Sequence, residues 1–169
     1  YSNNIFVFGL LADGGYGGYT SNDKLTSFEG FSFMPSDNET VIASTMLNDT
    51  DKAIMTYKDE KTLIHIFDDN GKEKAVNEYN NLIDTEDNYI QLLSSQNGYY
   101  INVNNETVSY ADYSGNVSPV KQLGDKDILG ITKNKDNKAV ILLSGFDGKT
   151  TIADLTEDNI SNERTCGDK

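Results

Sequence analysis

Residues 60–71, EKTLIHIFDDNG, decide how the rest of the sequence is interpreted. Leu63, His65 and Phe67 alternate with two isoleucines, and a polar quartet that ends in glycine closes the run. Alternation at a period of two, followed by turn residues, is typical of a β-strand that enters a hairpin. The stretch therefore predicts a strand and a tight turn.

The same pattern occurs twice more along the chain. Residues 106–115 read ETVSYADYSG and residues 149–159 read KTTIADLTEDN, and each has a threonine before a short apolar strand and a polar turn. The aspartates associated with the three turns, Asp68, Asp112 and Asp154, lie 44 and then 42 residues apart. We expect one shared architectural role for them, which is to accept hydrogen bonds from the backbone of the following turn. Calcium binding is the alternative, but the loops lack oxygen ligands at alternate positions.

Other segments extend the repeat. Strands are expected over 4–11 and 25–34, near Val41, Ala53 and Leu63, over 75–79, and near Tyr89, Tyr99, Val108, Val120, Ile128, Ala139 and Thr151. Residues 74–93 also fit a short helix, which is kept as an alternative. The glycine-rich residues 13–19 predict a loop. After Leu155 the chain becomes polar, so residues 160–169 are expected to be a tail, and the 4–11 strand could take the missing fourth place in the last unit.

The repeats IHIFDDNGK, VSYADYSGN and TIADLTEDN, within residues 41–159, resemble β-propeller repeats. They lack the Gly-His and Trp-Asp signatures of WD40 repeats. The resemblance implies an all-β fold of antiparallel meander repeats that is propeller-like, either a complete small ring or a partial propeller. We expect residues 1–169 to form a single all-β domain or an excerpt of a larger propeller. The resemblance also implies binding on the loops between strands.

The charge of the chain limits its partners. Its net charge is −13, from 27 acidic and 14 basic residues, which opposes binding to nucleic acid and to anionic lipid surfaces. The sequence has no apolar run of about 20 residues, the length that spans a bilayer, so membrane insertion is not expected. Five Asn-X-Ser/Thr sequons favour an extracellular or cell-surface location. The cytoplasm is the alternative, because Cys166 is the only cysteine and no internal disulfide can form.

No catalytic constellation is recognisable in the sequence. His65 is the only histidine, no polar partner for its ring can be named, and a structural role is expected. We therefore predict no catalytic residues, no metal site and no cofactor. The candidate binding residues are tyrosines in the glycine-rich segment and near the second repeat: Tyr16, Tyr19, Tyr99, Tyr100 and Tyr113. For the cluster near the second repeat, packing of the aromatic rings across strands is the favoured alternative.

These observations favour a non-enzymatic protein–protein interaction module or scaffold with another protein as its partner. Two alternatives remain open. Exposed tyrosines and carboxylates would suit an extracellular glycan-binding domain. The chain could also be part of a hydrolase whose catalytic residues lie elsewhere.

Overall fold

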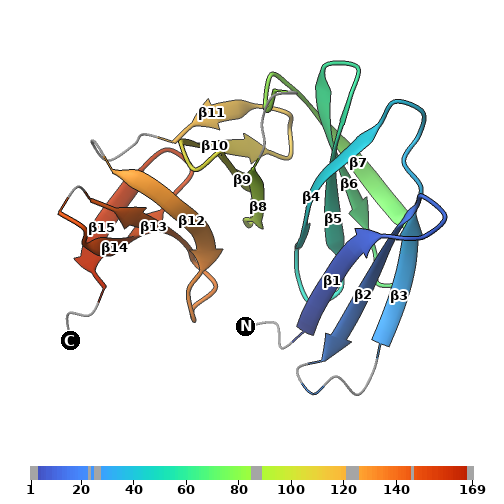
Figure 1. Ribbon diagram of the computed structural model, residues 1–169, viewed down its shortest axis with the longest axis horizontal. Helices are drawn as coiled ribbons and strands as arrows, with labels where there is room; N and C mark the ends of the chain where they lie inside the picture. Colours follow the sequence, from blue (N-terminus) through green and yellow to red (C-terminus); the bar gives the residue numbers. More distant parts are fainter. Residues whose placement is uncertain are drawn as a thin grey trace. The chain divides into compact units, whose positions relative to one another are not determined.

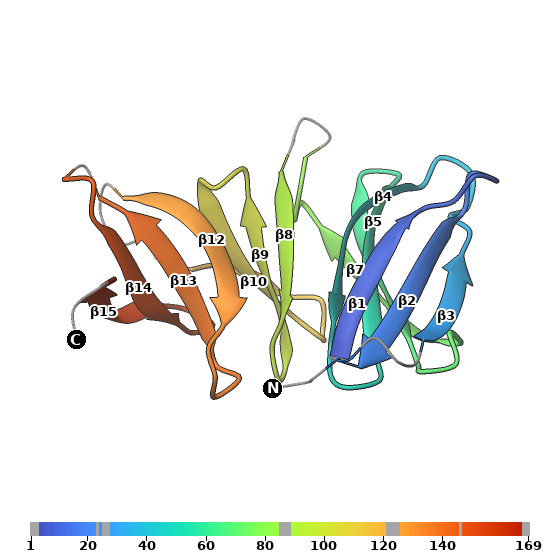
Figure 2. The same ribbon diagram turned by 60° about the horizontal axis from the view of Figure 1, so that its bottom comes forward.

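The computed structural model describes residues 4–22, 24, 28–84, 89–120, 126–145 and 147–166. These residues form fifteen β-strands in four antiparallel sheets (Figures 1 and 2). Contacts between Cα atoms divide the chain into two compact units, Ser2–Asn81 and Leu82–Lys169, where we expected one domain over 1–169. Each unit is described by itself.

The first unit contains two sheets. The three-stranded sheet has the order β1 (Asn4–Leu10), β2 (Tyr16–Asn22), β3 (Phe28–Phe33), and the four-stranded sheet has the order β4 (Thr40–Met46), β5 (Lys52–Lys58), β6 (Lys61–Phe67), β7 (Glu73–Asn80). Side chains alternate between the faces of a strand, so each sheet presents an apolar row to the other. Phe33, Ile54 and Phe67 are the buried centre of this contact, and Phe8 and Phe31 pack around them.

The second unit repeats the arrangement with two four-stranded sheets. One has the order β8 (Ile90–Ser94), β9 (Gly98–Val103), β10 (Thr107–Asp112), β11 (Val117–Pro119), and the other β12 (Asp127–Lys133), β13 (Ala139–Ser144), β14 (Thr150–Leu155), β15 (Ile160–Thr165). Aromatic and aliphatic side chains from both sheets form a continuous core. Its largest members include Tyr100, Tyr110, Ile141 and Leu155.

The predicted all-β fold of antiparallel meander repeats is confirmed. In every sheet, strands that are consecutive in the sequence are neighbours. The helical alternative for residues 74–93 is wrong for the described part, because β7 and β8 are strands. Asn77 and Tyr79 point inward at a period of two while their neighbours are exposed, and the ladder with β6 takes up the backbone hydrogen bonds.

The expected polar tail is a strand over most of its length. Residues 160–165 form β15, which pairs with β14 and buries Ile160 in the core. One buried isoleucine and a backbone ladder are enough to hold a strand whose other side chains are mostly polar. The last sheet therefore has its own fourth strand. The apolar N-terminal strand β1 does not fill that place, because it pairs with β2 in a separate sheet.

The predicted glycine-rich loop is wrong from Tyr16 onward. Residues 16–22 are β2, the middle strand of the first sheet. A Cβ atom at Gly18 would lie 2.2 Å from the Phe31 ring, and one at Gly17 would lie 2.8 Å from the Leu11 side chain. These glycines therefore allow large neighbouring side chains to lie flat on the strand. Glycine is more common in loops than in strands, and for that reason the sequence alone predicts a loop.

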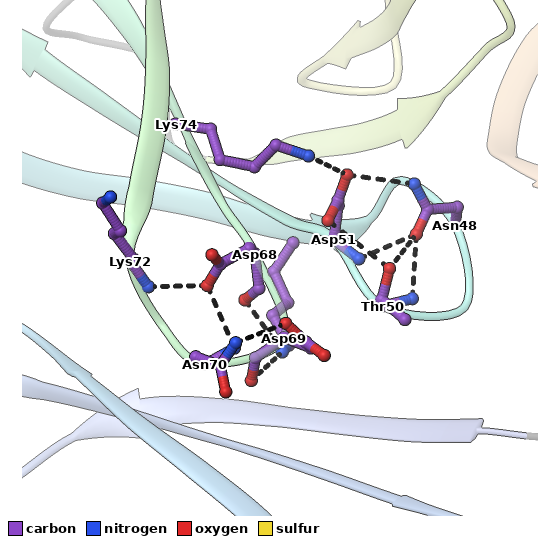
Figure 3. A network of polar contacts seen from close by, with 9 residues as sticks. Asn48, Thr50, Asp51, Asp68, Asp69, Asn70, Lys72 and Lys74 are labelled. Atoms are coloured by element: carbon purple, nitrogen blue, oxygen red, sulfur yellow. Dashed lines mark hydrogen bonds and ion pairs between the residues drawn. The ribbon is translucent and has the colours of Figure 1, made fainter.

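The turn that follows β6 has the geometry that the sequence predicted (Figure 3). Asp68 N donates to Lys72 O, and Gly71 N donates to Asp68 O, which is a three-residue hairpin loop with its last residue in the left-handed region, at φ 74°. Asp68 Oδ1 accepts hydrogen bonds from the backbone N–H groups of Asn70 and Lys72. The aspartate thus holds its own turn closed.

The second repeat aspartate has the same role and the third does not. Asp112 Oδ1 accepts from the backbone of Ser114 and Asn116. Asp154 instead lies within β14, where its carboxylate accepts from the side chains of Asn162 and Arg164. The prediction of one shared role is therefore wrong for Asp154.

We expect Asp68→Ala and Asp112→Ala each to lower the melting temperature by about 2–4 °C, because each leaves two turn N–H groups without their acceptor. Asp154→Ala is the matched control and should change it less, since it removes only exposed side-chain contacts. Thermal unfolding followed by circular dichroism measures all three. Equal losses would contradict the assignment of the turns.

Candidate functional site

The five candidate tyrosines differ in their exposure to solvent. Tyr99 and Tyr100 are 0% and 4% exposed, so the prediction that they contact a partner at the surface is wrong. Tyr16 packs against Phe8, with ring centroids 5.6 Å apart, in the core of the first unit. Tyr19 and Tyr113 are exposed, and they lie on two different surfaces.

Tyr19 belongs to the face of the first sheet that points away from the phenylalanine core. It lies directly opposite Val7 in the β1–β2 ladder, and Ile5 is two residues along on the same face. The three side chains are 53%, 60% and 43% exposed. We call Ile5, Val7 and Tyr19 the first-sheet face. A Cβ atom at Gly30 would be 3.1 Å from the Tyr19 ring, so the ring lies over β3.

Tyr113 lines a cleft in the second unit with a volume of about 640 Å³. We call it the acidic cleft, and its lining residues are Asn97, Tyr110, Asp112, Tyr113, Ser114, Ser118, Glu157 and Asp158. The β10–β11 turn supplies one wall and the β14–β15 turn supplies Glu157 and Asp158. Three of the eight lining residues are carboxylic acids and none is basic.

The carboxylates of the cleft differ in how they are used. Asp112 is held by its turn, and hydrogen bonds from the Asn116 side chain and backbone lower its pKa. Among the residues that the structure describes, neither Glu157 nor Asp158 forms an ion pair. Those two negative charges therefore face the cleft without a cation.

Tyr110 contributes a buried phenol to the same cleft. Burial, and then the nearby Glu157 carboxylate, raise the pKa of Tyr110 to about 12. The Ser95 side chain also interacts with the Tyr110 hydroxyl, and its hydrogen bond acts in the opposite direction on the pKa of that phenol. A neutral, buried phenol thus lies beside the acidic groups of the cleft.

His65 has partners that the sequence did not reveal. Its Nε2 lies 2.8 Å from Glu39 Oε1 and its Nδ1 lies 2.9 Å from Glu73 Oε2. The ring can donate to both carboxylates only when both nitrogens carry a proton. The expectation that no polar partner exists for this ring is wrong. The hydrogen-bonded, buried histidine itself is as expected.

Glu39 is the centre of this network and is only 5% exposed. Burial raises its pKa, but hydrogen bonds from Ser36, Thr56 and His65 more than offset this and lower it to about 2. Thr56 is fully buried and donates its hydroxyl to Glu39 across 2.7 Å. The Thr56 hydroxyl and the Glu39 carboxylate are closed off from solvent, and the network joins strands of one sheet, β5, β6 and β7, to the residue that precedes β4.

Within the described ranges, no group of three or more histidine, cysteine or acidic side chains could hold a metal ion. No helix of that part of the chain is long and apolar enough to cross a membrane. Cys166 is exposed and is not in a disulfide.

The fold places the chain among all-β proteins built from repeated antiparallel sheets. No family model and no curated protein matches the sequence. A crystal structure of a protein of unknown function from Bacteroides caccae is similar, with a TM-score of 0.61 and 12% identity, over 91% of this chain and 56% of that one. BBS1N, solved in complex with ARL6DN, gives a TM-score of 0.48 and 13% identity, over 97% of this chain and 54% of that one. The chain spans about half the length of these proteins, and the first likeness concerns the fold alone.

Proposed function

We propose that this chain is a non-enzymatic protein-interaction module that binds another protein through the first-sheet face. The observation that carries the proposal is the exposure of Ile5, Val7 and Tyr19 side by side on a regular sheet. Clustered apolar and aromatic side chains at a surface favour burial against a partner. Tyrosine is also one of the residues that contribute most at the centres of protein interfaces.

The chemistry of the rest of the described chain supports binding over catalysis. The one histidine is held between two carboxylates, and the hydroxyl nearest to it is fully buried. A net charge of −13 disfavours phosphate-bearing partners and favours a partner with a neutral or basic surface.

The test is a photo-cross-link from the first-sheet face. Benzoylphenylalanine at position 19 should give a discrete adduct with one protein from the source organism. Val7→Lys should reduce the adduct about tenfold, because a charge then has to be buried in the interface. Leu129→Lys, at a site 48% exposed in the other unit, is the matched control and should leave the adduct unchanged. An adduct that survives Val7→Lys, or none at all, would refute the proposal.

Glycan binding is a second candidate, and Tyr113 is the observation that favours it. The ring is 41% exposed and lines a cleft with amide, hydroxyl and carboxylate groups. A glycan array separates this function from the first, since a sugar-binding cleft should lose its signal with Tyr113→Ala and keep it with Val7→Lys. The third hypothesis, a portion of a hydrolase, stays a prediction that the full-length gene sequence would test.

A further inference from the structure

The first sheet has three strands, and each of the other three sheets has four. β1 lies beside β4, which is the first strand of its own sheet, and the two strands run in opposite directions (Figures 1 and 2). In the second unit, the first strands β8 and β12 lie side by side and run in the same direction (Figure 2). β1 therefore corresponds to the second strand of a four-stranded sheet, and no described strand pairs with its open edge.

The open edge of β1 presents backbone groups in a regular row. Leu11 N donates to Gly15 O, which fixes the direction of these groups along the strand. In an antiparallel pair, the N–H and C=O groups of successive residues point alternately toward the partner strand and away from it. The groups that point away from β2, to the open edge, are therefore those of Phe6, Phe8 and Leu10. They can bond to one more strand.

β1 also lacks the features that protect the edges of the four-stranded sheets. Charged side chains, proline, bulges and short length all discourage the addition of a strand at an edge. β7 and β15 carry charged residues, β11 has three residues and ends in proline, β8 has five residues, and the ladders of β4 and β12 contain bulges. β1 has seven residues, no charge, no proline and a regular ladder with β2.

The apolar side chains of β1 are incompletely covered. Phe6 and Phe8 stack on Phe31 but are only partly buried, whereas Phe33 in the same unit is buried. Leu10, at the end of the strand, is 69% exposed. The first-sheet face, on the other side of the strand, is exposed as well. A strand along the open edge would cover apolar groups on both faces.

We propose that the open edge of β1 binds an extended segment of a partner protein, which adds a fourth strand to the first sheet, antiparallel to β1. Main-chain hydrogen bonds to Phe6, Phe8 and Leu10 hold the segment, as in other complexes formed by strand addition. Its side chains alternate, so one set lies beside the two phenylalanines and the other beside Ile5 and Val7. This mode of binding rests on the proposed function, because the partner contacts β1 next to the first-sheet face.

Charge and length define the segment that fits. A second copy of this chain carries the same net charge of −13, so the two copies repel each other and a partner with a neutral or basic segment is favoured. Opposite the uncharged β1, the segment has about seven residues with apolar side chains at alternate positions. Basic residues at its ends suit the acidic chain.

The probe is the peptide acetyl-Lys-Val-Thr-Val-Thr-Val-Lys-amide, titrated into the full-length protein and followed by amide hydrogen exchange in NMR spectra. In the free protein, the amides of Phe6, Phe8 and Leu10 should exchange rapidly, and those of Val7 and Gly9, which point to β2, slowly. At saturation the peptide should slow the first three by about tenfold. The same peptide with a methyl group on each inner amide nitrogen cannot donate and should give no protection.

Leu10→Pro tests the edge, because it removes one N–H group that points away from β2. Its matched control is Leu10→Ala, which loses the same exposed side chain and keeps the N–H group. Proline on an edge strand leaves the ladder with β2 intact, so the melting temperatures of the two variants should agree within about 2 °C. The peptide should bind Leu10→Pro about fivefold more weakly than Leu10→Ala.

Equal protection by the methylated peptide, or equal binding to the two variants, would overturn the proposal. Slow exchange of the Phe6 and Phe8 amides in the free protein would also overturn it, since another segment of the same protein would then cover the edge. A dimer of the free protein in sedimentation equilibrium that Leu10→Pro dissociates would replace the partner with a second copy. A cross-link at position 19 that forms equally in Leu10→Pro and Leu10→Ala would refute the added strand and leave the first-sheet face as an interface.

Discussion

Replacing Glu39 by glutamine is expected to lower the free energy of unfolding at neutral pH by about 3 kcal/mol. The reason is the environment of the carboxylate. It is nearly inaccessible to solvent and accepts hydrogen bonds from Ser36, Thr56 and His65, which hold its pKa near 2. Glutamine has the same shape as glutamate but has no charge and one acceptor oxygen fewer. The groups that donate to Glu39 would therefore lose some of their hydrogen bonds.

The contribution of Glu39 to the free energy of unfolding should depend on pH. The pKa of Glu39 is lower in the folded chain, about 2, than its ordinary value of 4.5. Its contribution to stability is therefore fully present above pH 4.5 and is lost as the pH falls towards 2. The difference in unfolding free energy between the native chain and Glu39→Gln should shrink over that interval. Urea unfolding at a series of pH values measures it.

Glu73→Gln is the matched control, because Glu73 binds the other nitrogen of the same ring. Its side chain is 46% exposed, so water screens the interaction and the loss should be small. If the two variants were equally destabilised, or if the Glu39→Gln difference did not depend on pH, the network would not be centred on Glu39.

Local sequence predicted the strands and turns well because their determinants are local. The turn at Asp68 needs an acceptor at its first position and a residue that tolerates positive φ at its fourth, and both are within five residues. The same holds at Asp112 and Gly115. At Asp154 the sequence resembles the other two repeats, but the aspartate lies within β14 and not at the start of the turn. The true turn there begins at Thr156, whose N–H donates to Asn159 O.

The partners of His65 could not be found in this way. Glu39 precedes β4 and Glu73 begins β7, so the two carboxylates meet the ring only after the four strands β4 to β7 have paired. The two glutamates are 26 and 8 residues away from His65 in the sequence. No rule of sequence spacing predicts contacts at these separations, least of all across ladders that contain bulges. A buried charge network of this kind depends on which faces pack, and that is a tertiary property.

The choice of binding tyrosines failed for a related reason. Adjacent residues of a strand point to opposite faces, so a sheet covered on one face only would expose one of the Tyr99 and Tyr100 rings. In β9 both faces are covered, and Gly98 to Ile101 are all buried. Alternation predicts which residues share a face, but it does not say whether one face or both are covered. Tyr19 is exposed because its sheet is covered on one face only.

The second large effect is expected at Gly98, where alanine should destabilise the second unit by about 3 kcal/mol and lower the melting temperature by about 6–12 °C. A Cβ atom there would lie 2.2 Å from Ala111 O and 2.9 Å from Asp112 Cα. Both are backbone atoms of β10, which is hydrogen-bonded to β9 and β11 and cannot move without breaking a ladder.

Gly9→Ala is the matched control, since no neighbouring side chain or strand lies within 4 Å of its Cβ position. The melting temperature of this variant should stay within about 2 °C of the native value. Differential scanning calorimetry distinguishes the two variants, and a Gly98→Ala chain as stable as Gly9→Ala would mean that β9 and β10 do not pair in this register.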